Sequence, residues 1–213
     1  MTDRLNKIFA RLSPCGVFAD IGCDHGYIAK AMLDSGKCKK AIISDISAKC
    51  LSKAEELLRP YIESGKAESV VSDGFNKVGY CDLSLIAGMG GEEICSIINS
   101  AKILPERLVL QPMKNCAHVR LCAVNAGYKI VHDSVFKSAG KFYDLIVLKK
   151  GLDTLTQEEL EFGRDNINEK GKAFVEVLSI RIKRLKEYIL NPKVKGETKE
   201  NMIKEIEKLE KYL

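Results

Sequence analysis

Short apolar runs alternate with helical patterns along the first 150 residues of the chain. The first four runs are brief, unbroken in their apolar character and end at Gly, Asp or Ser, as strands buried on both faces of a parallel sheet do. The alternation predicts a doubly wound α/β fold. Strands are expected at Val17–Ile21, Ala41–Ser44, Glu68–Val71, Leu83–Ala87, Arg107–Leu110, Lys129–Val135 and Leu145–Leu148, with helices at Tyr27–Ser35, Ala48–Ser64, Gly91–Ser100 and Asn115–Ala126.

The last two strand-like runs differ from the others in their connection. The strand-like segment extends to Phe136 and the next begins at Phe142, so only Lys137–Lys141 separates them and we expect an antiparallel hairpin. A parallel sheet that finishes in such a hairpin is typical of the class I methyltransferase variant of the Rossmann-like fold, whereas the nicotinamide-binding variant usually continues in parallel.

The chain changes character after Gly151. Apolar residues recur there at three- and four-residue steps, which predicts two helices with narrow apolar seams. Asn191-Pro192 and Gly196 interrupt the pattern between them. We therefore expect a methyltransferase-type domain at residues 1–151 and a helical hairpin or coiled coil at residues 152–213; the alternative is two amphipathic helices packed on the first domain. The seams are Val175, Leu178, Ile182, Leu185 and Ile189, then Met202, Ile206, Leu209 and Leu213.

Charge and cysteine content add limited information about partners. The net charge is +5, and residues 151–213 hold 13 basic and 13 acidic residues, so the excess lies in the first part. That excess is compatible with a polyanionic partner and equally with none. The eight cysteines contain no C-x-x-C pair, so no metal site is expected. The sequence has neither a secretory signal pattern nor an apolar run long enough for a bilayer, which indicates a cytoplasmic protein with no membrane partner.

The segment Phe18–Tyr27 carries the strongest candidate chemistry. A strand ends near Asp20, Gly22 and Gly26 allow a sharp turn, and a helix begins near Tyr27. A carboxylate suits the sulfonium and ammonium groups of S-adenosylmethionine and would repel the pyrophosphate of a dinucleotide. Asp24 adds to this preference. The alternative is a tight strand–helix turn that binds no ligand.

Two more aspartates end the next two strands. Asp45 is placed to accept hydrogen bonds from ribose hydroxyls, and Asp73 from an adenine amino group. Ligands of such sheets bind outside the carboxyl ends of the strands. Three strand ends that each present Asp to one edge therefore predict S-adenosyl-L-methionine as the cofactor.

Several short motifs are distributed along the chain. They are Arg4-Leu5, Asp20-Ile21-Gly22-x-Asp24-His25, Ser72-Asp73-Gly74, Ile86-Ala87-Gly88-Met89-Gly90-Gly91, Leu110-Gln111-Pro112-Met113, Ala126-Gly127-Tyr128 and Gly140-Lys141-x-Tyr143. Together they resemble those of the bacterial tRNA (adenine-22 N1)-methyltransferase family, TrmK. The resemblance implies a Rossmann-like methyltransferase domain with a C-terminal coiled coil, and methyl transfer to N1 of adenine 22 in the D-arm region of tRNA.

The resemblance also implies roles for individual residues. Gly88 and Met89 would position the target base where it meets the cofactor. The run Asp45-Ile46-Ser47 departs from the family pattern, which puts a ribose contact through Ile46 in doubt. The implied cofactor residues are Asp20, Gly22, Cys23, Asp24, His25, Gly26, Asp45, Ile46, Asp73, Gly74, Ala87 and Gly88.

Contacts with tRNA are expected from basic and apolar residues outside the cofactor loop. A solvated face explains each cation equally well, and core packing explains Tyr27 and Met89. No general base is evident, because Glu92 and Glu93 suit a helix N-terminus and Asp82 opens a strand at the opposite sheet edge. We expect a monomer; the alternatives are a methyltransferase for another RNA or a small molecule, and a non-catalytic nucleotide-binding module. The expected substrate residues are Arg4, Tyr27, Gln111, Pro112, Lys114, Arg120 and Lys141, with Lys7 and Arg11 as further backbone contacts.

Overall fold

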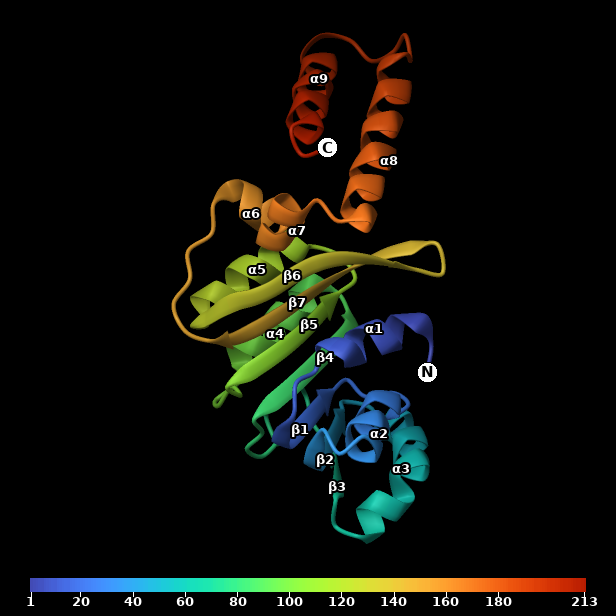
Figure 1. The fold of residues 1–213 in the computed structure, drawn as a ribbon, viewed down its shortest axis with the longest axis vertical. Helices are drawn as coiled ribbons and strands as arrows, with labels where there is room; N and C mark the ends of the chain where they lie inside the picture. Colours follow the sequence, from blue (N-terminus) through green and yellow to red (C-terminus); the bar gives the residue numbers. More distant parts are fainter.

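A computed structural model describes residues 1–213 and contains one mixed seven-stranded sheet (Figure 1). The strand order is β3-β2-β1-β4-β5-β7-β6. The first five strands pair in parallel, while β7 runs antiparallel to both of its neighbours. The predicted methyltransferase-type sheet with a terminal hairpin is therefore confirmed. The strands are β1 (Cys15–Ile21), β2 (Cys38–Asp45), β3 (Ala67–Val71), β4 (Leu83–Met89), β5 (Arg107–Pro112), β6 (Tyr128–Ser138) and β7 (Lys141–Lys150).

Helices cover both faces of this sheet and form two hydrophobic cores. One core joins the sheet to α1, α2 and α3, and the other joins it to α4 and α5. Burial on both faces explains why β1, β2 and β4 read as unbroken apolar runs. These helices are α1 (Asp3–Arg11), α2 (Tyr27–Asp34), α3 (Ala48–Glu63), α4 (Gly91–Ser100) and α5 (Cys116–Asn125).

Three helices were missed in the sequence: α1, α6 (Gln157–Phe162) and α7 (Arg164–Glu169). Helices α6 and α7 have only six residues each, too few to show an apolar period, whereas the apolar pattern of α1, with Leu5, Ile8 and Phe9 on one face, was overlooked. Local capping signals mark two of them. The Thr2 hydroxyl accepts a hydrogen bond from Leu5 N at the start of α1. Thr156 and Glu159 form a reciprocal capping box at the start of α6.

A buried ionic network joins the sheet to α6. The Arg120 guanidinium donates to both Asp133 oxygens, at 2.7 and 2.9 Å, and to Asp144 Oδ1 at 2.7 Å. It also donates to the carbonyls of Leu160 and Glu161 in α6. The prediction that Arg120 contacts tRNA is wrong, because its side chain is completely buried and all its partners lie within the protein.

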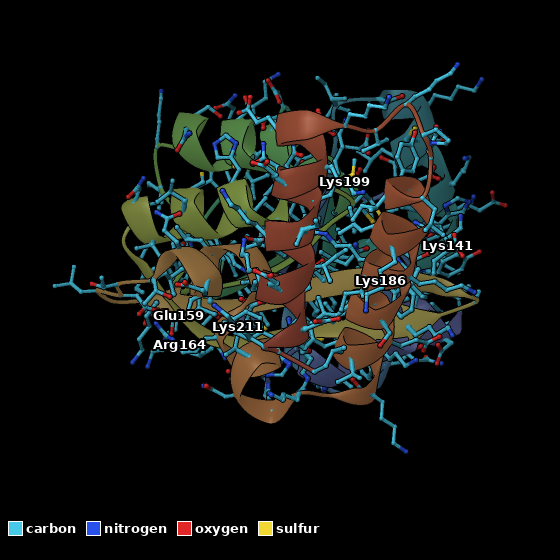
Figure 2. The ribbon with its side chains drawn as sticks, turned by 90° about the horizontal axis from the view of Figure 1, so that it is seen from above. Lys141, Glu159, Arg164, Lys186, Lys199 and Lys211 are labelled. Atoms are coloured by element: carbon cyan, nitrogen blue, oxygen red, sulfur yellow. The ribbon has the colours of Figure 1, made fainter.

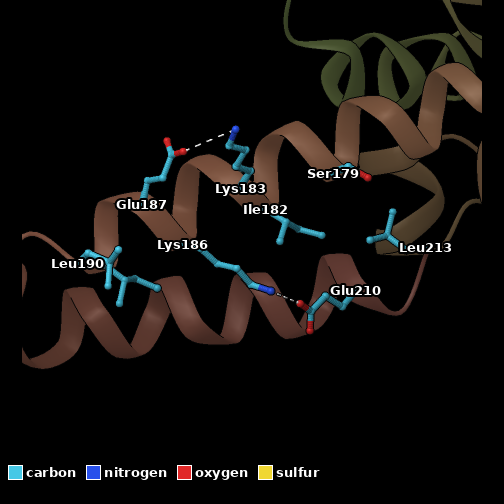
Figure 3. Close-up of a pocket in the computed structure, with 9 residues that line it drawn as sticks. Ser179, Ile182, Lys183, Lys186, Glu187, Leu190, Glu210 and Leu213 are labelled. Carbon is cyan, nitrogen blue, oxygen red and sulfur yellow. Dashed lines mark hydrogen bonds and ion pairs between the residues drawn. The ribbon is translucent and has the colours of Figure 1, made fainter.

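The last two helices, α8 (Lys172–Ile189) and α9 (Gly196–Glu210), pack against each other beyond the sheet (Figure 1). Phe162 of α6 joins residues of both helices in a separate small core. The predicted helical hairpin is therefore present; it extends beyond the sheet, and α8 also contacts β6. A Lys186–Glu210 ion pair of 2.8 Å bridges α8 and α9 beside a shallow groove that Ile182, Leu190 and Leu213 help to line (Figure 3).

Basic side chains are exposed along this part of the molecule. Figure 2 shows Lys186, Lys199 and Lys211 on the α8–α9 hairpin and Lys141 at the turn between β6 and β7. The same view shows Glu159 beside Arg164, whose Nε donates to Glu159 Oε1 at 2.8 Å. None of the helices has the length and apolar character required to cross a bilayer.

Candidate active site

A cavity of about 480 Å³ lies beyond the carboxyl ends of β1 and β4. The strand order reverses between these two strands, which makes this the topological switch point at which α/β sheets bind ligands. Three segments line the cavity: the start of α1, the β1–α2 connection, and the end of β4. The lining residues include Thr2, Arg4, Leu5, Asp20, Gly22, Cys23, Asp24, His25, Gly26, Tyr27, Ala87, Gly88 and Met89.

The connection between β1 and α2 is a tight turn that only glycine accommodates at two points. Gly22 and Gly26 have φ angles of 75° and 71°, where other residues are strained. A Cβ on Gly22 would lie 1.8 Å from Met89 Cε. The turn is tied to the neighbouring strand because Gly22 N and Cys23 N both donate to Ser44 O, at 2.7 and 2.9 Å. The backbone of this loop is therefore held close to the cavity.

Asp20 is a buried carboxylate with no cationic partner in the protein. Its residue is only 8 % exposed and it forms no ion pair. Burial raises the pKa of Asp20 to about 6, while hydrogen bonds from the Cys23 thiol and the Ala29 N–H oppose this rise. A buried carboxylate without a counter-charge costs free energy. A cationic group of a ligand in the cavity would remove that cost, so Asp20 fits the sulfonium and ammonium groups of S-adenosylmethionine.

Asp24 and His25 are the more exposed part of the same loop. Asp24 accepts a hydrogen bond of 3.0 Å from Lys53 Nζ, and this bond lowers the pKa of Asp24. His25 Nδ1 lies 2.8 Å from the other carboxylate oxygen, and the His25 ring stacks on Tyr27 at a centroid distance of 5.5 Å. Asp24 already has protein partners, which makes it a weaker candidate for holding a cation than Asp20.

The carboxyl ends of β2 and β3 lie at the same sheet edge as that of β1, but their residues are not among those that line the cavity. Asp45 Oδ1 accepts from Ser47 N at 2.8 Å, and Asp45 O accepts from Ser72 N at 3.0 Å. Asp73 is exposed, and Gly74 follows it with a φ of 54°. The structure thus brings Asp20, Asp45 and Asp73 to the same sheet edge. Ile46 is 71 % exposed, so its side chain is free to cover a ligand placed over Asp45.

The pairing of β4 with β5 is irregular at Gly88, near the end of β4. The register between β4 and β5 shifts between Ala87 and Met89, and Gly88 has a φ of 83°. Met113 N donates to Met89 O at 2.9 Å, which ties the end of β4 to the end of β5. A Cβ on Gly88 would lie 3.2 Å from Arg4 Nη2. This glycine therefore allows close approach of α1 to the cavity.

The predicted substrate residues divide into exposed and buried groups. Tyr27, Lys114 and Lys141 are exposed, and Arg4 is half-buried at the cavity wall. Gln111 and Pro112 are buried, and Gln111 Nε2 donates to Pro112 O at 2.9 Å. The prediction that these two residues contact the substrate is wrong, because neither side chain is accessible.

Asp82 and Glu92, which the sequence analysis set aside as general bases, lie outside the cavity. Asp82 accepts a hydrogen bond of 2.8 Å from Val17 N near the start of β1, at the opposite edge of the sheet. Glu92 lies 2.9 Å from His118 Nδ1, outside the cavity. Sequence reasoning missed Thr2 and Leu5 in the cavity wall and assigned no role to Tyr143, whose ring lies against Arg4. The Thr2 helix cap was the signal that could have located α1 here.

Known proteins are similar to this chain in sequence and in fold. A methyltransferase-domain family model matches residues 1–146. The tRNA (adenine(22)-N(1))-methyltransferase of Bacillus subtilis is 29% identical over 160 residues, which cover 71% of this chain and 66% of that protein. The structure of M. capricolum TrmK with S-adenosyl-homocysteine has a TM-score of 0.87 at 25% identity, covering 100% of this chain and 97% of that one. The B. subtilis M1A22 tRNA methyltransferase TrmK has a TM-score of 0.85 at 22% identity, covering 100% and 98%.

Proposed function

This chain belongs to the methyltransferase-domain family, and from that premise we propose that it transfers a methyl group from S-adenosylmethionine to N1 of adenine 22 in tRNA. The observation that carries the cofactor assignment is the unpaired buried carboxylate of Asp20 in the switch-point cavity. The similarity to the B. subtilis enzyme and to M. capricolum TrmK supports the substrate assignment.

The proposed cofactor residues form one continuous edge of the sheet. Asp20 would neutralise the cationic end of the cofactor, with Gly22, Cys23 and Gly26 providing close backbone approach. Asp45 and Ile46 would contact the ribose, and Asp73 and Gly74 the adenine. His25 and Asp24 would close the exposed side of the cavity. Together these contacts fix the cofactor's direction along the strand ends.

Methyl transfer to a ring nitrogen requires little acid–base catalysis from the protein. When bound, the sulfonium cofactor supplies an already activated methyl group to a ring nitrogen lone pair. The task of the chain is to hold the adenine in line and to exclude water. Gly88 and Met89 line the cavity where the base would enter, and the Ala87 and Gly88 carbonyls would accept from its exocyclic amine. Such acceptors would make N1 more electron-rich, so no general base is required.

Recognition of tRNA would come from a wider surface. N1 lies on the Watson–Crick edge, so the adenine must leave its stack to reach the cavity. The exposed Tyr27 ring offers a face for the displaced base. Lys114 and Lys141 would contact the RNA backbone, and the residue 152–213 extension would read tRNA shape. We place this activity in a cytoplasmic monomer.

A methyl-transfer assay tests this proposal directly. The full chain is incubated with labelled S-adenosylmethionine and two transcripts of one tRNA, one with A22 and the other with G22. We expect label only in the A22 transcript and a reverse-transcription stop at that position. Label that stays off tRNA, or that enters both transcripts equally, would contradict the substrate assignment.

A further inference from the structure

The switch-point cavity contains two charged groups that lack a charged partner in the protein. Arg4 is the only Lys or Arg that lines the cavity. The acidic lining residues are Asp20 and Asp24, and Asp24 is already paired with Lys53. None of the ion pairs of the chain includes Arg4 or Asp20. The cavity wall thus presents one unpaired cation and one unpaired anion at separate places.

The Arg4 side chain is held in place by an aromatic ring from the final hairpin. Its guanidinium carbon lies 5.4 Å from the centroid of the Tyr143 ring, within the range of a cation–π contact. Tyr143 in turn stacks on Phe136 at 5.5 Å. Tyr143 lies near the start of β7, so its contact with Arg4 connects the β6–β7 hairpin to the cavity. It restricts the rotamers of Arg4, which pre-organises the guanidinium.

The polar end of Arg4 is also incompletely satisfied. Its Nε is buried and has no hydrogen-bond partner within the protein. Its Nη2 lies against the end of β4, where a Cβ on Gly88 would come within 3.2 Å of it. Buried donors almost always have an acceptor. A ligand oxyanion in the cavity would provide one, and planar guanidinium groups bind carboxylates and phosphates through paired N–H donors.

We propose that Arg4, held against Tyr143, binds the carboxylate of the cofactor's amino-acid end in the cavity that Asp20 also lines. This assignment rests on the proposed function. An α-amino acid group is a zwitterion, and its ammonium and carboxylate match the two unpaired charges of the cavity wall. Arg4 is then a cofactor-binding residue, and Tyr143 is a positioning residue that acts through it. The final hairpin is thereby part of the cofactor site.

An RNA phosphate is the other oxyanion that would suit a guanidinium. Phosphates of a folded RNA meet accessible cations, and Lys114 and Lys141 are exposed in that way. Arg4 is half-buried at the cavity wall, with its Nε out of contact with solvent. Its position therefore favours a ligand that enters the cavity itself.

Calorimetry with two matched ligands tests the assignment without relying on activity. S-adenosylhomocysteine carries the amino-acid end, whereas 5′-methylthioadenosine has the same nucleoside and thioether without it. For Arg4→Met in the full chain we expect the Kd of S-adenosylhomocysteine to rise at least tenfold and that of 5′-methylthioadenosine to change less than twofold. Tyr143→Leu should show the same selectivity with a smaller rise, and the conservative Tyr143→Phe should bind as the original chain does.

The possible results separate this assignment from the proposed function. Equal weakening of both ligands by Arg4→Met would mean a general structural role and would overturn the assignment. Unchanged binding of both, with a weaker salt dependence of tRNA binding, would make Arg4 a phosphate contact and would also overturn it. Failure of the original chain to bind S-adenosylhomocysteine would instead contradict the proposed function.

Discussion

Two regions of this molecule bury a charge, and they differ in how that charge is satisfied. At the junction between the sheet and the helical extension, Arg120 has two carboxylates and two carbonyls as partners. At the switch-point cavity, Asp20 has a thiol and an N–H but no cation. Complete pairing within the protein marks Arg120 as a part of the architecture. Incomplete pairing beside a cavity marks Asp20 as a part of a binding site.

The comparison explains why the protein tolerates the less satisfied charge. Removing one partner of a buried ion pair leaves the other charge buried and uncompensated, which is strongly destabilising. The folded chain therefore depends on Arg120 keeping its carboxylate partners. The cavity carboxylate reduces its cost by a raised pKa, which lets it take up a proton when no cation is near. Asp20 therefore destabilises the folded chain when it is ionised and unpaired, and a cationic ligand that pairs with it removes this cost.

Removal of Arg120 should have the largest effect on stability. Arg120→Leu leaves Asp133 and Asp144 without their common partner, and we expect a loss of about 3–5 kcal/mol in the free energy of unfolding. Urea denaturation followed by circular dichroism measures this loss. Lys114→Leu replaces an exposed cation and should stay within about 0.5 kcal/mol. A loss below about 1 kcal/mol for Arg120→Leu would remove the distinction between the two regions.

Neutralising Asp20 should have the opposite effect: it should weaken cofactor binding without lowering the stability of the fold. Asp20→Asn removes a buried charge that has no partner, so the free energy of unfolding at pH 7 should stay the same or rise. The Kd of S-adenosylhomocysteine should increase by about 10- to 100-fold, as for the loss of a charge-assisted contact of roughly 1.5–3 kcal/mol. Calorimetry and urea denaturation on the same variant check both values.

A carboxylate at the opposite sheet edge provides the matched control. Asp82→Asn alters the backbone contact at Val17 and should cost some stability while the Kd of S-adenosylhomocysteine stays within about twofold. Equal loss of affinity in Asp20→Asn and Asp82→Asn would mean that the loss does not come from a contact between Asp20 and the ligand.

The pH dependence should follow the raised pKa of Asp20. Because its folded pKa is about 6 and its unfolded value is near 3.8, Asp20 makes the folded state less stable as pH rises from about 4 to 6. Cofactor binding moves the other way, since the ligand cation needs the ionised form. Affinity should therefore increase up to about tenfold per pH unit below 6 and level off above it. Asp20→Asn should flatten this profile, and a profile unchanged by the substitution would contradict the role of Asp20.

An exposed cation should have the smallest effect. Lys141 lies at the turn of the β6–β7 hairpin with no ion pair, so Lys141→Ala should leave stability and cofactor affinity unchanged. If it contacts a phosphate, the slope of log affinity for tRNA against log salt concentration should decrease by roughly 0.7–0.9. Filter binding at several salt concentrations measures this slope. An unchanged slope would remove Lys141 from the RNA surface.

Features that depend on local pattern could be predicted from the sequence. Residues close together in the sequence form each of these patterns: the apolar runs of β1 to β4, the tight turn before β7, and the seams of α8 and α9. The same holds for the loop at Asp20, whose glycines and carboxylate are contiguous. These elements are where periodicity and turn chemistry agree with the final fold.

Features that depend on distant partners could not be predicted. Arg120 looks like any basic residue on a helix until β6 and β7 bring Asp133 and Asp144 to it. Arg4 was expected on an RNA-facing surface, and only the packing of α1 against the end of β4 places it in the cavity wall. A charged side chain reveals its role through its neighbours, and those come from across the fold.

The central claim is that the acidic edge of this sheet selects a cationic nucleoside over a pyrophosphate. The most direct measurement is calorimetry of the full chain at pH 7.5 with S-adenosylmethionine and, separately, with NAD. We predict saturable binding of S-adenosylmethionine at one site per chain and no measurable binding of NAD. Tighter binding of NAD would contradict the claim.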